Sequence, residues 1–236
     1  MLQDLSIVTI TYNNPEDLIK SYKSLETFRI AGGTQIIVNG GATIRPLIKD
    51  DCVLIEEPDG GIYDAINKGI ERVNTPFFML IHSGDFLVVP VEILRDQLSL
   101  MIDKHLDVLL NDCTIAFGNK KRLMSAKNWK PWMFLLGAQP PHPPVIYRID
   151  SIRHFTYNIE YPVIADFDYL ERIFKTKPNY HTGNQILVHM SAGGATSSGF
   201  LSFLRVNREF KNLKGKYIAC FYSFTRPLIK IIQMFK

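Results

Sequence analysis

The stretch PDGGIYDAINKGIERVNTPFFMLIHSGD, residues 58–85, decides the fold of this chain of 236 residues. Its glycine pair lets the backbone bend sharply and approach a ligand closely. Apolar side chains then recur at spacings of three and four, which predicts a helix over 62–73 with one buried face. The continuous apolar run at 77–81 predicts a strand buried on both faces of a parallel sheet. Because open α/β sheets bind ligands outside the carboxyl ends of their strands, we predict that Asp85 belongs to a ligand site.

The residues before this stretch repeat the same pattern of strand and helix. Strands are predicted at 5–11, 35–38 and 52–56. Asn14 is placed to cap the first helix and Pro15 to begin it. Strands that alternate with helices in this way predict a doubly wound, mainly parallel sheet. The first strand-to-helix turn is TYNNPE, and neither GxGxxG nor GxxxxGK[ST] occurs, which disfavours a nicotinamide dehydrogenase and a P-loop kinase.

The second half of the chain is less regular. We predict a helix at 90–104, a strand at 106–110, a hairpin within 112–124, a helix at 163–175 and a strand at 185–190. Between them, the Pro-rich and aromatic segment 127–144 contains QPPHPP and predicts a binding loop without regular structure. The segment SAGGATSSG, residues 191–199, is rich in small residues and predicts a lid.

The bulk composition is that of a folded protein, with 46% hydrophobic and 21% charged residues. The net charge of +4 does not indicate a nucleic-acid partner, but it suits diphosphates or an anionic membrane surface. The three cysteines are far apart and lack metal-ligand spacing. No basic segment precedes the first strand and no apolar run approaches the ~18–20 residues of a spanning helix. We therefore expect a cytoplasmic protein, soluble or peripheral to the membrane.

Several motifs, taken together, resemble family 2 glycosyltransferases with the GT-A fold. They are TYN after the first strand, VNGG after the second, EPDGGIYDAINKGI, HSGD, the SAK before the Trp-rich stretch, IADFDYLERIF and GGATS. The likeness is greater to bacterial colanic-acid and O-antigen enzymes, and it covers residues 5 to about 200 in collinear order. It implies a Rossmann-like sheet with helices on both faces, in a domain at 1–200. That domain would have a nucleotide-sugar half at about 1–112 and an acceptor half at about 113–200, followed by a basic amphipathic helical tail at 201–236.

The resemblance also implies the roles of individual residues. The donor-binding residues would be Thr9, Tyr12, Asn13, Asn39, Asp59, Asp64 and Lys68. Asp85 would be the last carboxylate of a DxD-type motif, holding Mg²⁺ or Mn²⁺ against the donor diphosphate. Asp166 matches the general base, which takes the proton from the acceptor hydroxyl. His142 and Trp132 would contact the acceptor.

This chain departs from the family pattern at two positions. Asn39 stands where the family has an Asp that contacts the base, and Ser83 replaces the first Asp of the metal motif. These departures leave open a noncatalytic subunit that binds a nucleotide sugar. A nucleotidyltransferase is a further alternative, but it predicts a Gly-rich basic loop where this chain has TYNNPE.

Simpler structural roles stay open for several of these residues. Asp85 and Asp166 could each act as a helix-terminal acid without a ligand. His142 could be a loop histidine, and His189 is either a strand histidine or a further metal ligand. Trp132 could pack in the core or stack on a sugar or lipid.

The function expected from the sequence is an inverting glycosyltransferase. It would move a hexose-type sugar from a UDP-sugar to a polyprenyl-diphosphate-linked oligosaccharide in bacterial surface polysaccharide synthesis. Its place would be the inner face of the cytoplasmic membrane, where the basic tail suits an anionic surface.

Overall fold

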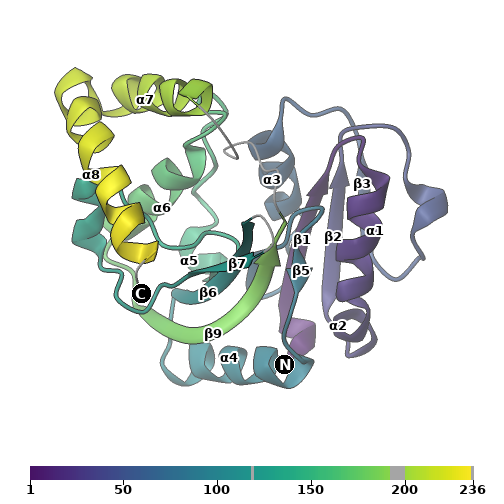
Figure 1. Cartoon of the computed structure of the whole chain (residues 1–236). Helices are drawn as coiled ribbons and strands as arrows, with labels where there is room; N and C mark the ends of the chain where they lie inside the picture. The colour runs from purple at the N-terminus through teal and green to yellow at the C-terminus, as the bar shows by residue number, and fades with distance from the viewer. Residues whose placement is uncertain (118–119, 192–199, 235–236) are drawn as a thin grey trace.

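A single mixed sheet forms the centre of the computed structural model, which describes residues 1–117, 120–191 and 200–234 (Figure 1). The strands are β1 (Leu5–Thr11), β2 (Thr34–Asn39), β3 (Val53–Glu56), β4 (Phe77–Leu80), β5 (Phe86–Leu87), β6 (Val108–Phe117), β7 (Lys120–Met124), β8 (Ile146–Arg148) and β9 (Tyr180–Met190). Their order is β3-β2-β1-β4-β8-β6-β9-β5, and β7 pairs with β6. The first four strands in this order are parallel, whereas β8 runs antiparallel to both β4 and β6. The strands of the amino-terminal half thus form one parallel block, and β6 and β9 form a second parallel pair.

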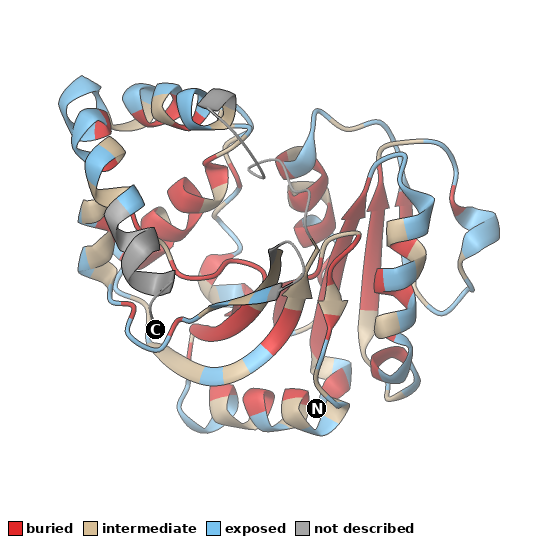
Figure 2. Cartoon of the chain, viewed as in Figure 1, coloured by how far each residue is buried: buried red, intermediate tan, exposed pale blue. Residues whose placement is uncertain are grey.

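Helices cover both faces of the sheet. They are α1 (Pro15–Ser24), α2 (Glu26–Ile30), α3 (Ile62–Glu71), α4 (Val91–Asp103), α5 (Ile149–Ile152), α6 (Ala165–Lys175), α7 (Phe200–Lys214) and α8 (Lys216–Met234), with 3-10 turns η1 (Leu2–Asp4), η2 (Arg45–Leu47) and η3 (Pro131–Leu136). Every residue of β1 is buried, because alternate side chains enter different cores (Figure 2). Val8 and Ile10 pack with α3 and α6, while Leu5 and Ile7 pack with α2 and α4.

Most of the predicted elements are confirmed in place, and the α/β class with them. Asn14 caps α1 by accepting a hydrogen bond from the Asp17 backbone at 3.2 Å, with Pro15 at the first helical position. The predicted strand at 106–110 and the first half of the hairpin are one long strand, β6, and the predicted strand at 185–190 already begins at Tyr180. The proposed lid at 191–199 lies, except for Ser191, outside the described residues.

The prediction that segment 127–144 has no regular structure is wrong. Pro131 begins the 3-10 turn η3, which Gly137 ends in the left-handed conformation at φ 72°. Proline suits the first position of such a turn because its missing N–H has no intrahelical partner there. Trp129 packs in the core against Phe134 and Phe174. Aromatic packing thus orders a segment whose composition indicated only a loop.

The described part of the carboxyl-terminal tail forms a hairpin of α7 and α8, at the end of the molecule opposite β3 (Figure 1). The hairpin is fixed to the body by polar contacts. Glu209 accepts the N–H groups of Val163 and Ile164 at 3.0 Å each, and the Tyr222 hydroxyl donates to the Phe134 carbonyl at 2.7 Å. Among the described residues, no helix has both the length and the apolar character needed to cross a membrane.

Candidate active site

A cleft of about 570 Å³ opens at the carboxyl ends of β1 and β4. It is lined by Ile10, Thr11, Tyr12, Asn14, Asp17, Asp59, Gly61, Ile62, Ala65, His82, Ser83, Gly84, Asp85, Met190 and Ser191. β1 and β4 are neighbours and parallel, so the turns that follow them meet at one edge of the sheet. This is the edge at which such sheets bind ligands, and we call the space the first cleft.

Several polar atoms of the first cleft have no partner within the described protein. They are Thr11 Oγ1, His82 Nδ1 and Ser83 Oγ. Burial lowers the pKa of His82 to about 4, so the ring is neutral near pH 7. Since buried polar groups normally form hydrogen bonds, these atoms are candidates for contact with a polar ligand.

Asp85 lies at the floor of the first cleft and is 6% exposed. One of its oxygens accepts the Ser191 backbone N–H at 3.2 Å, and burial raises the pKa of this carboxyl to about 7. No cationic side chain among the described residues forms an ion pair with it, and no three potential ligands cluster there. A lone buried carboxylate suits a Mg²⁺ or Mn²⁺ ion that takes its other ligands from a diphosphate and water, as Mg²⁺ commonly does. The residues do not make a complete metal cage by themselves.

The loop before α3 is braced by three residues predicted to bind the donor. Asp64 accepts the Gly60 N–H at 2.8 Å, which lowers the pKa of this carboxyl, and the Lys68 ammonium donates to the Pro58 carbonyl at 2.6 Å. Asp59 accepts the Gly61 N–H at 2.9 Å. Only Asp59 of the three lines the first cleft, so Asp64 and Lys68 are placed to hold the loop in shape.

Asn39 and Asn13 join the loop after β2 to the end of β1. The Asn39 amide donates to the Ala42 carbonyl at 2.8 Å, and Asn13 accepts the Ala42 N–H at 3.0 Å. Thr9 lies deeper, fully buried, where its hydroxyl accepts a hydrogen bond from Gln35 at 3.1 Å. These three residues shape the edge of the sheet, whereas Tyr12, 66% exposed, lines the first cleft itself.

A second cavity, of about 520 Å³, lies between the proline-rich loop, the start of α6 and the α7–α8 hairpin. Met190 lines both this cavity and the first cleft, so the two spaces adjoin. Asp166, at the start of α6, faces the second cavity. Its carboxylate accepts the Gln139 amide N–H at 2.6 Å and the Phe167 N–H at 2.8 Å, while burial raises its pKa. The Asp166 carboxylate is thus fixed by two hydrogen bonds, and its raised pKa makes it a stronger base than an exposed aspartate.

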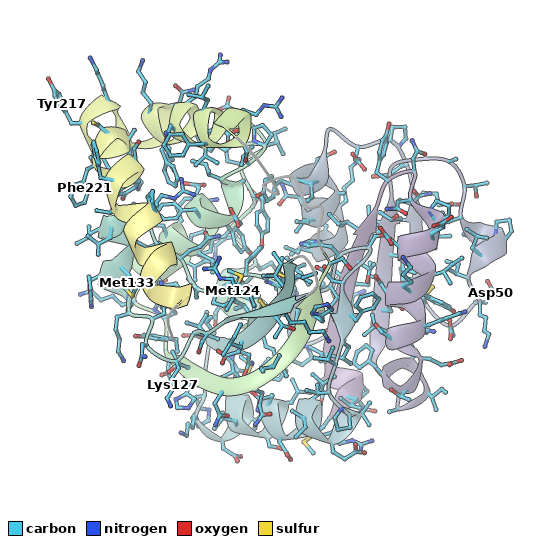
Figure 3. The ribbon with its side chains drawn as sticks, viewed as in Figure 1. Asp50, Met124, Lys127, Met133, Tyr217 and Phe221 are labelled. Carbon is cyan, nitrogen blue, oxygen red and sulfur yellow. The ribbon has the colours of Figure 1, made fainter. Side chains whose placement is uncertain are left out.

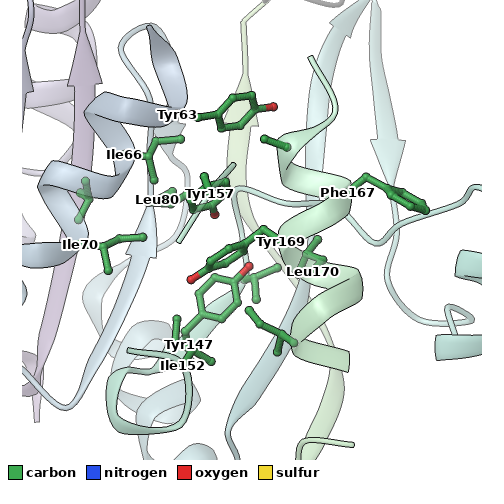
Figure 4. Packing of buried hydrophobic residues seen from close by; sticks show 14 of the residues in the cluster. Tyr63, Ile66, Ile70, Leu80, Tyr147, Ile152, Tyr157, Phe167, Tyr169 and Leu170 are labelled. Atoms are coloured by element: carbon green, nitrogen blue, oxygen red, sulfur yellow. The ribbon is translucent and has the colours of Figure 1, made fainter. Parts of the chain in front are cut away.

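His142 also lines the second cavity, and its ring nitrogens are engaged by tyrosine hydroxyls. Nε2 lies 2.8 Å from the Tyr157 oxygen and Nδ1 lies 3.4 Å from that of Tyr147. Tyr157 stacks between Tyr169 and Tyr63, with ring centroids 3.9 and 5.5 Å away (Figure 4). This aromatic cluster forms a firm wall behind the cavity.

Trp132 and His189 lie outside both cavities. Trp132 is 59% exposed on η3. His189 stacks on Phe86 and bonds through Nδ1 to the Thr114 hydroxyl at 2.9 Å. Because neighbouring residues of a strand point to opposite faces, His189 points away from the side on which Met190 lines the cavities.

Four further residues of this region were not among the site residues predicted from the sequence, although Tyr63 lies in EPDGGIYDAINKGI and Gln139 in QPPHPP. Gln139 orients Asp166, Tyr63 donates to the Val163 carbonyl at 3.3 Å, Glu209 fixes the backbone before α6, and Arg226 lines the second cavity. Glu209 is the only acidic residue in 200–234, and this is the feature of the sequence that could have drawn attention to it.

Comparison with known proteins agrees with the expected fold. No family model matches the chain. Two curated proteins of Mycobacterium tuberculosis, strains CDC 1551 and H37Rv, are each named an uncharacterized glycosyltransferase and are 31% identical over 94 residues. The match covers 34% of this chain and 34% of each relative, so it spans about a third of their length.

Solved structures match over most of the chain. S. aureus TarS 1-349 in complex with UDP has a TM-score of 0.65 at 14% identity, covering 93% of this chain and 69% of that one. The same protein has also been solved with UDP-GlcNAc, at a TM-score of 0.62. Mannosyltransferase PcManGT from Pyrobaculum calidifontis, in complex with GDP-Man and Mn²⁺, has a TM-score of 0.61 at 10% identity, covering 89% and 61%. The GT-A-like glycosyltransferase fold expected from the sequence is confirmed.

Proposed function

We propose that the chain is an inverting family 2 glycosyltransferase. It transfers a hexose-type sugar from a nucleotide diphosphate, a UDP-sugar, to a polyprenyl-diphosphate-linked oligosaccharide in bacterial surface polysaccharide synthesis. The observation that supports this most is the placement of Asp85 and Asp166 in two adjoining cavities, at the edge where α/β sheets bind ligands. The nucleotide sugars bound by the structural neighbours further support a donor of this class.

The first cleft is the donor site in this proposal. Thr11, His82 and Ser83 offer unpaired polar atoms to the nucleotide sugar, and Tyr12 offers an exposed ring at the rim. Asp85 is the residue that would hold a divalent cation, and such an ion would supply positive charge to offset that of the leaving diphosphate. Neutral His82 adds no charge of its own and is suited to hydrogen bonding.

The second cavity is the acceptor site. The Asp166 carboxylate takes the proton of the acceptor hydroxyl while that oxygen forms its bond to the anomeric carbon. The bond from this carbon to the donor diphosphate breaks in the same displacement, and the electron pair leaves with the diphosphate. A single displacement inverts the configuration, so an α-linked donor gives a β-linked product. Gln139 holds the carboxylate in place for this step.

The alternative is a noncatalytic subunit that binds a nucleotide sugar in the same cleft. The incomplete set of metal ligands among the described residues is the observation that favours it. The nucleotidyltransferase alternative has less support, because the first strand-to-helix turn TYNNPE carries neither glycine nor a basic residue.

The outer face of the α7–α8 hairpin supports peripheral association with an anionic membrane. Tyr217, Phe221 and Phe224 are 90, 49 and 69% exposed, at spacings that place them on one side of α8. Figure 3 shows Tyr217 and Phe221 on the outer side of this helix. The exposed charges of the hairpin are basic, since Glu209 is buried against the body. Exposed aromatic rings among basic side chains are typical of helices that lie at a lipid interface.

The proposal is tested first by binding. Melting temperatures are measured with UDP-, GDP-, TDP- and CMP-sugars, with and without Mn²⁺, on the wild type, on Asp85→Asn and on the exposed control Asp96→Asn. A ligand at about 100 times its dissociation constant stabilises by roughly 2.7 kcal/mol. We expect one nucleotide class to stabilise the wild type and the control with metal, and Asp85→Asn to lose this shift. If no nucleotide sugar shifts the melting temperature, the proposal fails.

Turnover separates the enzyme from the binding subunit. With a nucleotide sugar that binds, release of the nucleotide diphosphate by hydrolysis or transfer is followed for the wild type and for Asp166→Asn. We expect Asp166→Asn to keep the donor-induced melting shift and to lose turnover. A wild type that binds donor but never releases diphosphate supports the binding subunit instead.

A further inference from the structure

Arg226 is a cation placed inside the second cavity. It belongs to α8, and its turn of helix is fixed from both sides by Tyr222 and by Thr225, whose hydroxyl donates to the Leu136 carbonyl at 2.8 Å. The guanidinium carbon lies 4.7 Å from the centroid of the Phe210 ring. The side chain is therefore held at the cavity wall and does not extend freely into solvent.

This guanidinium has no carboxylate within ion-pair distance among the described residues, although it and Asp166 attract each other across the second cavity. Among the described residues, none forms a hydrogen bond or an ion pair with it within the distances that define these contacts. Asp166 lies in the same cavity, but its carboxylate is bound by Gln139 and by the Phe167 N–H. Arginine stays protonated in proteins, and a partly buried charge that forms no direct ion pair is costly. The arrangement suits an anion that arrives with a ligand.

The rest of the cavity wall narrows the class of ligand. Apart from Asp166, Gln139 and His142, its side chains are mainly apolar, including Phe203, Val206, Phe210, Pro140, Pro141 and Pro143. An acceptor that fits must therefore carry a hydrocarbon part as well as an anionic group. The planar guanidinium binds phosphate oxygens in a bidentate manner, which favours a phosphate ester over a hydroxyl-bearing neutral lipid.

We infer that Arg226 binds the phosphate or diphosphate of an acceptor whose hydrocarbon chain lies along the apolar wall formed with α7. This inference rests on the proposed function only in taking the second cavity as the acceptor site. It assigns to the hairpin a direct role in substrate binding, in addition to membrane contact. It also places the anionic group and Asp166 in one cavity, so the acceptor sugar is held near the base.

A binding experiment tests the inference without catalysis. Farnesyl diphosphate, farnesyl monophosphate, farnesol and inorganic pyrophosphate are titrated into the 236-residue chain by calorimetry, with no donor present. We expect the wild type to bind farnesyl diphosphate at least about tenfold more tightly than farnesol, since hydrogen bonds to charged groups are the stronger ones. Arg226→Gln should lose this preference and keep its affinity for farnesol, and Arg226→Lys should retain part of it.

Arg208→Gln, an exposed change on α7, is the matched control and should behave as the wild type. An unchanged melting temperature for Arg226→Gln shows that the variant is folded, and Arg226→Lys gives a second measurement if it is not. The inference is overturned if Arg226→Gln keeps the preference for the diphosphate, or if pyrophosphate alone binds as tightly as farnesyl diphosphate. Because no donor or turnover is involved, these outcomes are independent of whether Asp166 acts as a base.

Discussion

Replacing Glu209 by alanine tests how the hairpin positions the start of α6. One oxygen of Glu209 accepts the backbone N–H groups of Val163 and Ile164, each at 3.0 Å. These residues come directly before α6, whose second residue is Asp166. Glu209 is 9% exposed, so little water is available to replace the carboxylate. We expect the alanine variant to be less stable and to hold Asp166 less firmly.

The magnitude follows from the two N–H groups left without an acceptor. A buried donor without a partner costs about 1–3 kcal/mol. The Ile164 N–H lies in a buried contact and should show the full cost, whereas the partly buried Val163 N–H can reach water and should show less. The sum is a loss of about 2–4 kcal/mol in the free energy of unfolding. Glu209→Gln keeps a carbonyl acceptor of the same reach, so we expect a loss of about 1 kcal/mol or less.

Urea denaturation at pH 7.5 measures the difference, with the neighbouring exposed change Arg208→Ala as control. Equal m-values across the variants are required, because a changed m-value means that the unfolded or native state has itself changed. The alanine variant should also lose transfer rate at saturating donor, whereas the glutamine variant should keep most of it. A free energy of unfolding for Glu209→Ala within about 0.5 kcal/mol of the wild-type value, which is about the error of the method, would refute the reasoning.

Three further predictions concern the two cavities and the hairpin surface. Burial raises the pKa of Asp166, and a general base must be deprotonated, so kcat should fall as the pH drops through this raised pKa. Asp166→Asn should lower kcat by about 10²–10⁴-fold at pH 7.5 and should abolish this acidic limb of the pH profile. A Cβ at Gly40 would lie 1.8 Å from an Asp59 oxygen, so Gly40→Ala should push Asp59 aside and raise the donor KM about tenfold, with little change in melting temperature. Phe224→Ser should weaken binding to vesicles of anionic lipid by about 5–30-fold, which corresponds to roughly 1–2 kcal/mol. Ile30→Ser, a control at an exposed position on α2, should leave vesicle binding unchanged.

The parallel half of the sheet could be predicted from the sequence because its signals are local. Strands such as 77–81 are short apolar runs, and the helix over 62–73 shows a clear period. The antiparallel insertion of β8 between β4 and β6 could not, since its three residues follow a run of prolines and pair with strands far away in the chain. Three residues of strand carry too little pattern to be distinguished from a loop.

The residues of the first cleft were likewise easier to predict from the sequence than those of the second cavity. Asp59 and Asp85 follow recognisable turns, and the structure places both in the first cleft. Asp64 and Lys68 belong to the same motif, but their contacts brace the loop, because side chains one helical turn apart meet each other before they meet a ligand. A motif identifies the segment that forms a site, whereas the direction of each side chain depends on the packed helix.

The acceptor side depends on contacts between distant segments, and this explains how the two cavities are held in fixed relation. Tyr63 is the second residue of α3, directly after the loop that carries Asp59. Its hydroxyl donates to the Val163 carbonyl, three residues before Asp166. Its ring stacks on Tyr157 (Figure 4), whose hydroxyl oxygen lies 2.8 Å from Nε2 of His142. Stacked and hydrogen-bonded rings have few alternative arrangements in a close-packed interior. The loop that carries Asp59 and the start of α6 that carries Asp166 are therefore positioned by one aromatic cluster, although Tyr63 and Val163 are 100 positions apart in the sequence. In the proposed function, this cluster would fix donor and acceptor relative to each other.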